Sequence, residues 1–326
     1  QACALPISQD EALMKRGEYL AIDGDCTACH TAENGKSFAG GYAFKMPMGT
    51  IISGNITPSK QFGIGHWSEA EFSKAVRDGV NPDGRHLYPA MPYTSYRNIT
   101  DDDMHALYSY FQQGVTAVDA APAEKTQLKF PFNLPGVMAV WDLLFAGNSS
   151  FSPDPALNAE QNRGKYLVDG LAHCSTCHTP RNAFMAEDSS KFLAGAYVDG
   201  WRASNITSDP VSGIGGWSNQ EITTYLKTGH VQNKAQAGGP MADAIQHSFS
   251  HMDDKDLQAI AAYLKTVPSI REQGQTRPDY APGAAKNVDW TSFEKLPYPA
   301  SDSPDYITSN TTDGAVLYNT NCAACH

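Results

Sequence analysis

The chain has 326 residues, 18% of them charged, and its formal net charge is −11. The acidic excess is spread along the chain, and no basic stripe of the kind that binds nucleic acid is present. We interpret the excess as a solvated acidic surface. No apolar run approaches the roughly 20 residues that a bilayer-spanning helix needs. No signal peptide precedes Gln1, so we expect a processed, mature start.

Six of the seven cysteines lie in three copies of the pattern C-x-x-C-H, and the seventh, Cys3, is expected to form a disulfide or to stay a free thiol. Two cysteines at this spacing each form a thioether with one haem vinyl group, and the next residue presents an imidazole to the iron. A zinc ribbon would place its cysteine pairs about 15–20 residues apart, whereas 148 residues separate each pair from the next here. A redox dithiol does not require the histidine. The motifs therefore predict covalent haem c, held by Cys26, Cys29 and His30, by Cys174, Cys177 and His178, and by Cys322, Cys325 and His326.

The first predicted element is a helix that leads into the first haem motif and carries the step Gly17-x-x-Leu20. We expect the glycine to let this helix approach the last helix of its domain closely, because glycine has no side chain to keep them apart. The same step precedes the other two motifs, as Gly164/Leu167 and Gly314/Leu317.

Two further helices follow in each of the first two units. The first of them has a capping box and a C-terminal glycine. The second runs from Thr100 to Gly114, with its counterpart between Asp253 and Pro268, and apolar residues recur in it with helical spacing. We find no convincing strand pattern. The capping residues are Ser68, Glu71 and Gly79, and then Ser218, Glu221 and Gly229.

Iron that is held by histidine on one side can take methionine on the other, which suits electron transfer. In the first unit only Met91, 24 residues after Trp67, has an equivalently placed methionine in the second unit, where Met241 follows Trp217 by 24 residues. We therefore predict that Met91 and Met241 are the second axial ligands. The competing side chains are Met46, Met48 and Met104 in the first unit and His247 and His251 in the second.

Two more residue pairs repeat between the units and are candidate cofactor-binding residues. Trp67 and Trp217 either donate an indole N–H to a haem propionate or fill the core, and the sequence leaves both readings open. Asn55 and Asn205 each open an N-I-T triplet, and we discount its use as a glycosylation site.

Each complete unit resembles a class I cytochrome c domain. The whole chain resembles the triple-haem cytochrome c subunit of bacterial membrane-bound dehydrogenase complexes, through the haem motifs and stretches such as "GTIISGNITP", "GIGHWS", "LYPAMPY" and "GGPMADAIQHSFSHMDDKDLQAIAAYLK". The resemblance implies an all-α fold with tandem class I cytochrome c domains joined by long irregular linkers. It places the domains at 1–114 and 157–268, the linkers at 115–156 and 269–312, and the start of a third domain at 313–326.

The third haem site is incomplete in this chain, since no methionine follows it. By analogy with the repeat length, we expect the natural chain to continue for roughly 90 residues. The linker 269–312 is rich in proline and is expected to be extended. In the linker 115–156, Val137, Val140, Trp141 and Leu144 have helical spacing. They either pack onto their own domain or form a patch for a partner or the membrane.

The resemblance also implies a function, namely a non-catalytic electron-transfer subunit. Its donor would be a catalytic dehydrogenase subunit, flavin-dependent as the first choice and PQQ-dependent as the second, and its acceptor would be membrane ubiquinone. A small third subunit is a further expected partner. We expect the protein to associate peripherally with the periplasmic side of the bacterial cytoplasmic membrane. The alternatives are a multihaem peroxidase, which needs an open iron site, a cytochrome subunit of a molybdenum aldehyde dehydrogenase, and a structural tether.

Overall fold

The computed structural model of the chain describes residues 8–148, 150–198 and 200–281. Cys3, the linker beyond residue 281 and the third haem motif lie outside the described residues. The contacts gather the residues up to Tyr280 into one unit. This unit contains two domains with the same framework, which we call the first domain (residues 8–128) and the second domain (residues 157–280). The connecting segment (residues 129–156) joins them.

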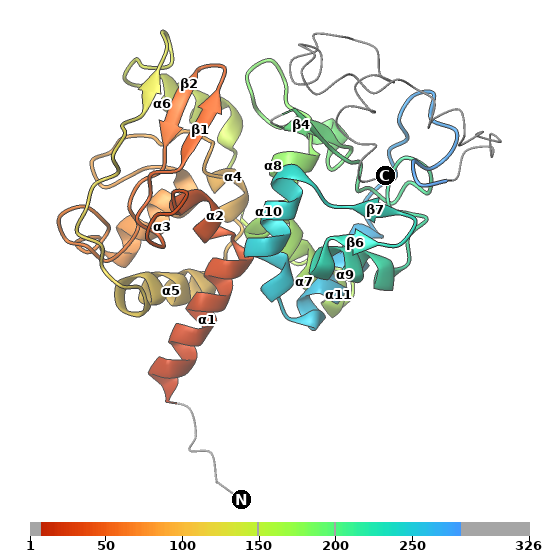
Figure 1. Cartoon of the computed structure of the whole chain (residues 1–326), viewed down its shortest axis with the longest axis horizontal. Coiled ribbons are helices and arrows are strands. Elements are labelled where there is room, and N and C mark those ends of the chain that lie inside the picture. Colours follow the sequence, from red (N-terminus) through yellow and green to blue (C-terminus); the bar gives the residue numbers. More distant parts are fainter. Residues whose placement is uncertain (1–7, 149, 199, 282–326) are drawn as a thin grey trace, which may run out of the picture. The chain divides into compact units, whose positions relative to one another are not determined.

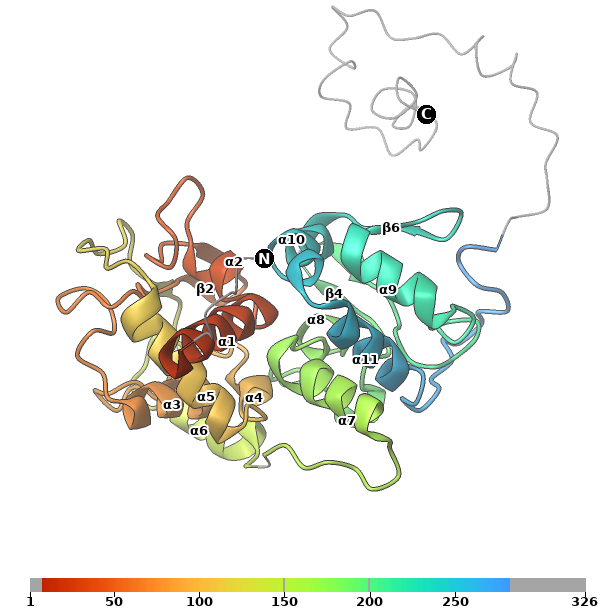
Figure 2. The same cartoon turned by 90° about the horizontal axis from the view of Figure 1, so that it is seen from below.

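In the first domain, the helix that enters the haem motif packs along the last helix, as α1 and α5 show in Figures 1 and 2. A three-stranded antiparallel sheet in the order β1-β2-β3 stands above them. The elements are α1 (Gln9–Asp23), α2 (Cys26–His30), β1 (Ala43–Met46), β2 (Gly49–Ile52), α3 (Glu69–Asp78), α4 (Tyr93–Tyr96), α5 (Asp101–Ser109), η1 (Tyr110–Gly114) and β3 (Gln127–Leu128).

The connecting segment carries α6 (Val137–Trp141) and η2 (Asp142–Ala146). In the second domain, α7 again lies along the last helix, α11 (Figure 2). The elements are α7 (Ala159–Tyr166), η3 (Leu167–Leu171), α8 (Ser175–His178), η4 (Ser189–Lys191), β4 (Ala196–Val198), β5 (Trp201–Ala203), α9 (Asn219–Thr228), β6 (His230–Val231), β7 (Ala235–Gln236), α10 (Gly239–His247), η5 (Phe249–His251) and α11 (Asp254–Leu264).

The close approach of the first and last helices is confirmed in both domains. A Cβ atom on Gly17 would lie 2.2 Å from the carbonyl oxygen of Ala106, and one on Gly164 would lie 1.9 Å from that of Ala259. Both distances are shorter than any real contact of this kind. A side chain at either position would push the two helices apart.

The predicted helix ends are also confirmed. Ser68 and Glu71 form a reciprocal capping box at the start of α3, as Ser218 and Glu221 do at the start of α9. Gly79 and Gly229 end these helices with φ of 65° and 76°, in the left-handed region that favours glycine.

The architecture is mostly helical, as predicted, but the expectation that strands are absent is wrong. The described residues contain seven strands of two to four residues, in the antiparallel sheets β1-β2-β3, β4-β5 and β6-β7. Strands this short do not show the two-residue alternation that identifies a strand in a sequence.

Both predicted linkers begin as parts of the preceding domain. In the first domain, β3 pairs with β2, and the Asn55 amide donates to the carbonyl oxygen of Val118 at 2.8 Å. In the second domain, the Arg271 guanidinium pairs with Asp209 at 2.7 Å. The folded domains therefore extend beyond the predicted boundaries at residues 114 and 268.

The apolar helix of the connecting segment packs onto the first domain with only part of its apolar surface. Met138 is 8% exposed, but Val140 is 58% and Leu144 is 65% exposed. Of the predicted face, Val137 and Trp141 are half-buried and Val140 and Leu144 are exposed. The residue of this segment that is buried, Met138, lies outside that face. Within the described ranges, no helix combines the length and the apolar content that a bilayer crossing requires.

Candidate haem sites

The first haem motif opens onto a large apolar cavity. The cavity has a volume of about 1090 Å³, and α2 supplies Cys26, Cys29 and His30 to its wall. A haem of planar, mostly apolar surface needs a chamber of this kind, since burial of its faces stabilises the complex. Other residues of the wall come from α3, α5, η1 and the loops before and between them, including Ile64, Trp67, Phe72, Met91, Leu107 and Phe111.

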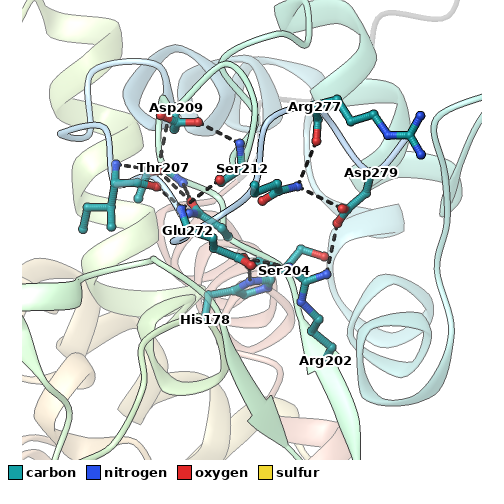
Figure 3. Close-up of polar contacts among 12 residues, drawn as sticks. His178, Arg202, Ser204, Thr207, Asp209, Ser212, Glu272, Arg277 and Asp279 are labelled. Atoms are coloured by element: carbon teal, nitrogen blue, oxygen red, sulfur yellow. Dashed lines mark hydrogen bonds and ion pairs between the residues drawn. The ribbon is translucent and has the colours of Figure 1, made fainter. Parts of the chain in front are cut away.

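The predicted iron ligands have equivalent orientations in the two domains. The Nδ1 atom of His30 donates to the carbonyl oxygen of Gly54 at 2.8 Å, and that of His178 donates to Ser204 at 2.6 Å (Figure 3). This hydrogen bond fixes the ring and its tautomer, and it leaves Nε2 available to a metal. Burial lowers the pKa of both histidines, which keeps the imidazoles in the neutral form that binds iron.

The cysteines do not have the character of a redox dithiol. Burial raises the pKa of the Cys26 thiol and of the Cys174 thiol to about 12 in each case. Reactive dithiols have a lowered pKa, because the thiolate is the nucleophile. Among the described residues, no group of three or more His, Cys, Asp or Glu side chains could hold a metal ion. The geometry therefore fits thioether attachment better than either the zinc or the dithiol alternative.

Two methionines reach the wall of the first cavity. Met91, the predicted ligand, lines it from the turn before α4, and Met138 lines it from α6. Matching the two repeats of the sequence did not identify Met138, because Met138 has no counterpart in the second domain. Met104 is 2% exposed within the core of the first domain, which leaves it as a packing residue. The axial role of Met91 stays a prediction, supported by its place in the cavity.

The connecting segment holds the Met91 loop in place. The hydroxyl of Tyr93 donates to Asp142 of η2 at 2.7 Å, and His86 pairs with the same carboxylate. These two residues bracket Met91 in the sequence. The Asp142 side chain thus ties both ends of the loop to the segment that supplies Met138.

In the second domain, Met241 lies in the first turn of α10 and is half-buried against the core. Its two predicted rivals, the half-buried His247 and the exposed His251, bond to nearby backbone carbonyl groups. The Nδ1 atom of His247 contacts the oxygen of Asp243 at 2.9 Å, and Nε2 of His251 contacts that of Gln246 at 3.0 Å. The axial role of Met241 stays a prediction, supported by its position 24 residues after Trp217, which matches that of Met91 after Trp67.

Asn55 and Asn205 organise loops with their amides. The Oδ1 atom of Asn55 accepts from the backbone N–H and the hydroxyl of Thr57, and its Nδ2 donates to Val118 and Ala120. These four bonds use the whole capacity of the amide. Asn55 therefore touches the cavity as part of its wall and has no group left for a haem propionate. Asn205 repeats the pattern with Thr207 and Ile270.

The two tryptophans differ in their surroundings. Trp67 lines the first cavity. Trp217 packs edge-on against Tyr225 and Tyr280, and Lys234 Nζ lies 5.5 Å from its ring centroid. Trp67 therefore lies where a side chain could contact a haem, which keeps the haem-contact interpretation for this residue. For Trp217 the observed contacts are those of packing.

Figure 3 shows how the segment after α11 closes the second domain near its haem motif. Ser212 Oγ accepts from the backbone N–H of Glu272 at 2.9 Å, and Arg202 pairs with Glu272 and Asp279. Arg202 precedes Ser204, whose carbonyl orients His178. The charged pairs therefore support the loop that sets the ligand ring.

The two haem motifs lie close together across the domain interface. Burial, the Asp25 carboxyl and the Cys177 thiol of the second domain raise the pKa of Cys29 to about 12. Leu171 of the second domain forms part of the first cavity wall. Helix α10, which carries Met241, packs against α2. One haem site thus borders the other within the same chain.

Comparison with known proteins agrees with this geometry. The cytochrome c family profile matches residues 14–114 and 161–268. The chain is 46% identical to the fructose dehydrogenase cytochrome subunit of Gluconobacter japonicus, over 98% of this chain and 65% of that protein. It is 41% identical to the gluconate 2-dehydrogenase cytochrome c subunit of Pantoea cypripedii, over 97% of this chain and 69% of that protein.

It is also 40% identical to the cytochrome c subunit of the quinone alcohol dehydrogenase of Gluconacetobacter polyoxogenes, over 97% of this chain and 65% of that protein. The chain thus spans about two thirds of the length of these relatives. Three features of the structure agree with the matched profile, namely two haem motifs within the described residues, histidines oriented by backbone carbonyl groups, and an apolar cavity lined by methionines. The chain belongs to the cytochrome c family.

Proposed function

We propose that the chain is an electron-transfer subunit that relays electrons from a catalytic dehydrogenase subunit to membrane ubiquinone. The observation that carries the proposal is the first cavity, where the neutral, oriented His30 and Met91 both lie on the wall and would hold the iron of a bound haem. When bound, haem c supplies a one-electron carrier. Cys26 and Cys29 would hold it covalently, and the apolar wall would exclude water from it.

The same observation disfavours a peroxidase. An enzyme that activates peroxide at iron needs an open or displaceable axial position. The first cavity contains two methionine side chains, Met91 and Met138, besides His30. Either sulfur would fill the position that peroxide requires. The proximity of the second haem motif instead favours passage of electrons along the chain.

The names of the relatives support a shared relay with different donors. Cytochrome subunits of fructose, gluconate and alcohol dehydrogenases match this chain with 46%, 41% and 40% identity. The donor chemistry therefore belongs to the catalytic partner. We propose a flavin-dependent sugar or sugar-acid dehydrogenase as that partner, with a PQQ-dependent or molybdenum enzyme as the alternatives. A small third subunit and a third haem at Cys322, Cys325 and His326 would complete the assembly.

Exposed apolar side chains of the connecting segment support peripheral attachment to the periplasmic face of the cytoplasmic membrane. Phe130 is 76%, Leu143 is 84% and Leu144 is 65% exposed. Apolar side chains grouped on a surface mark places where water is displaced by a partner or a bilayer. We expect the holoprotein to float with vesicles of bacterial lipid, and a Leu143→Ser/Leu144→Ser variant to stay with the soluble fraction.

The test of the function is the purified native complex. Addition of the donor substrate should reduce the haems, and addition of a ubiquinone analogue should reoxidise them. Mass spectrometry of the complex identifies the catalytic subunit. If the donor substrate does not reduce the haems, and the haems are high-spin and turn over peroxide rapidly, the proposed relay is wrong and the peroxidase is supported.

A further inference from the structure

The interface between the two domains contains one set of contacts that occurs twice. The sequences "RGEYL" and "RGKYL" place an arginine and a tyrosine at matching positions of the first helices, as Arg16/Tyr19 and Arg163/Tyr166. Each tyrosine crosses into the other domain, whereas each arginine stays within its own. We call the resulting pair of Tyr–Asp–Arg contacts the reciprocal clasp.

One half of the clasp lies at the start of α5. Asp103 is 3% exposed and accepts from Arg16 Nε of its own domain at 2.8 Å. The hydroxyl of Tyr166, from the second domain, donates to its other oxygen at 2.6 Å. That hydroxyl also accepts from the backbone N–H of Thr100, the N-cap of α5, at 3.2 Å.

The other half repeats these contacts at the start of α11. Asp256 is 9% exposed and accepts two bonds from Arg163 of its own domain, at 2.8 and 2.6 Å. The hydroxyl of Tyr19, from the first domain, donates to Asp256 at 2.9 Å. It accepts from the backbone N–H of Asp253, the N-cap of α11, at 3.0 Å. Burial raises the pKa of both tyrosines, so both hydroxyls remain donors.

The position of the clasp connects it to the haem sites. Tyr19 precedes Cys26 by 7 residues and Tyr166 precedes Cys174 by 8 residues, each on the helical segment that leads into the haem motif. Beyond the clasp the two motifs approach each other, as the contact of α10 with α2 shows. The clasp and the two haem attachment sites therefore belong to the same interface.

We propose that Tyr19 and Tyr166 are positioning residues that hold the two haem sites at one fixed separation and thereby set the rate of electron transfer between them. The inference rests on the proposed function. In the step concerned, one electron leaves one haem and reduces the other, and no proton moves. The unit at the third haem motif has Asp313 and Val316 where the others have arginine and tyrosine. The arginine and tyrosine of the clasp are thus a feature of the first two sequence repeats.

The test uses the full chain with its haems, in a Cys322→Ala/Cys325→Ala background that leaves two haem sites. Electrons are injected by a photoreductant, and the equilibration between the haems is followed optically. We expect Tyr19→Phe/Tyr166→Phe to slow this step about tenfold, since small displacements of reacting groups have large effects on rate. The optical spectra of both haems should stay low-spin, and dipolar broadening of their paramagnetic signals should decrease.

The matched control is Tyr108→Phe, which removes one hydroxyl bond, to the Trp67 carbonyl oxygen at 2.8 Å, within the first domain. It should leave the equilibration rate unchanged. Asp103→Asn keeps both tyrosines but weakens one half of the clasp, and it should also slow the step. If the double variant fails to fold, the single variants Tyr19→Phe and Tyr166→Phe are measured in the same way.

An unchanged rate in the tyrosine variants would overturn the proposal. Slowing in the tyrosine variants without slowing in Asp103→Asn would also overturn it, because the tyrosines would then carry the electron themselves. Photoreduction needs neither the dehydrogenase nor quinone. This test can therefore fail or succeed independently of the test of the proposed function, which uses the dehydrogenase and quinone.

Discussion

The two domains share a framework but differ on the side where the second iron ligand is predicted. In the first domain, Met91 lies in a loop whose ends are bound by Asp142 of the connecting segment. In the second domain, Met241 lies on a regular helix, α10, that packs against the first haem motif. The helices and haem motifs thus form a constant scaffold. The segment that carries the predicted methionine differs between the domains, both in its local structure and in the part of the chain that it contacts.

The largest expected effect comes from removing the predicted ligands. Met91→Ala and Met241→Ala should each convert one haem to high spin and remove about half of the near-red methionine–iron absorption in a two-haem background. Met138→Ala is the matched control in the same cavity and should keep that absorption. If Met138→Ala loses it and Met91→Ala does not, the sulfur ligand comes from the connecting segment, and the equivalence of the two domains fails.

Each domain has a buried carboxyl group near its haem motif, and the two groups should affect the pH dependence of stability differently. Asp23 is 0% exposed and neither carboxyl oxygen has a hydrogen-bond partner, and burial raises its pKa from 3.8 to about 8. Because the folded state binds this proton more tightly, the contribution of Asp23 to stability is intact below pH 4. It falls as the pH rises to about 8. Asp23→Asn should therefore gain stability relative to the wild type over this range, by at most roughly 5 kcal/mol.

The counterpart in the second domain, Asp169, is bound by Lys165 at 2.9 Å and by Tyr263 at 3.3 Å. Burial raises its pKa, but the Lys165 ammonium stabilises the ionised form. Asp169→Asn should therefore gain less stability with pH than Asp23→Asn. Urea unfolding of both variants between pH 4 and pH 8 measures the difference. Parallel curves for the wild type and Asp23→Asn would show that the Asp23 carboxyl finds a partner in solution.

The close helix crossing gives an intermediate effect in both domains. Gly17→Ala and Gly164→Ala place a methyl group inside the contact with the facing carbonyl oxygen, so each should cost about 1–3 kcal/mol of unfolding free energy. The cost should be larger at Gly164, where the distance is shorter. Gly170→Ala is the control, since its nearest neighbour, Asn98 Cβ, lies at an ordinary 3.4 Å. Equal unfolding midpoints for all three would contradict the crossing.

The smallest expected effect concerns the hold on the Met91 loop. Asp142→Ala removes the acceptor of Tyr93 and the partner of His86, which should weaken the loop by about 1–3 kcal/mol. The near-red absorption of the first haem should then be lost at a lower temperature. The second haem of the same molecule is the internal control. Loss of both signals together would mean that Asp142 stabilises the whole unit.

Features that depend on neighbouring residues could be predicted from the sequence. The capping box at Ser68 and Glu71 and the haem motif at Cys26 each lie within a few residues, and so does the step at Gly17 that reports the helix crossing. The short strands could not be predicted, because two to four residues carry too little pattern. Met138 was missed for another reason, since nothing local shows that a linker folds back over a cavity.

The clasp lies between these cases. Its arginine and tyrosine were visible as a repeat, but the pairing of Tyr19 with Asp256 joins residues 237 positions apart. A repeat indicates that two positions do the same thing. The repeat does not show that each tyrosine bonds to the other domain, because that pairing depends on how the folded surfaces of the two domains meet.

In the reciprocal clasp each domain offers the same groups to the other, which is the pattern of the isologous interfaces that join two copies of one protein in a homodimer. In this chain both copies sit on one polypeptide, so Tyr19 meets Asp256 at the effective concentration of tethered partners, on the order of millimolar. Dilution that would dissociate a dimer leaves such a pair together. The spacing of the first two haem sites is therefore independent of how much of the protein a cell makes.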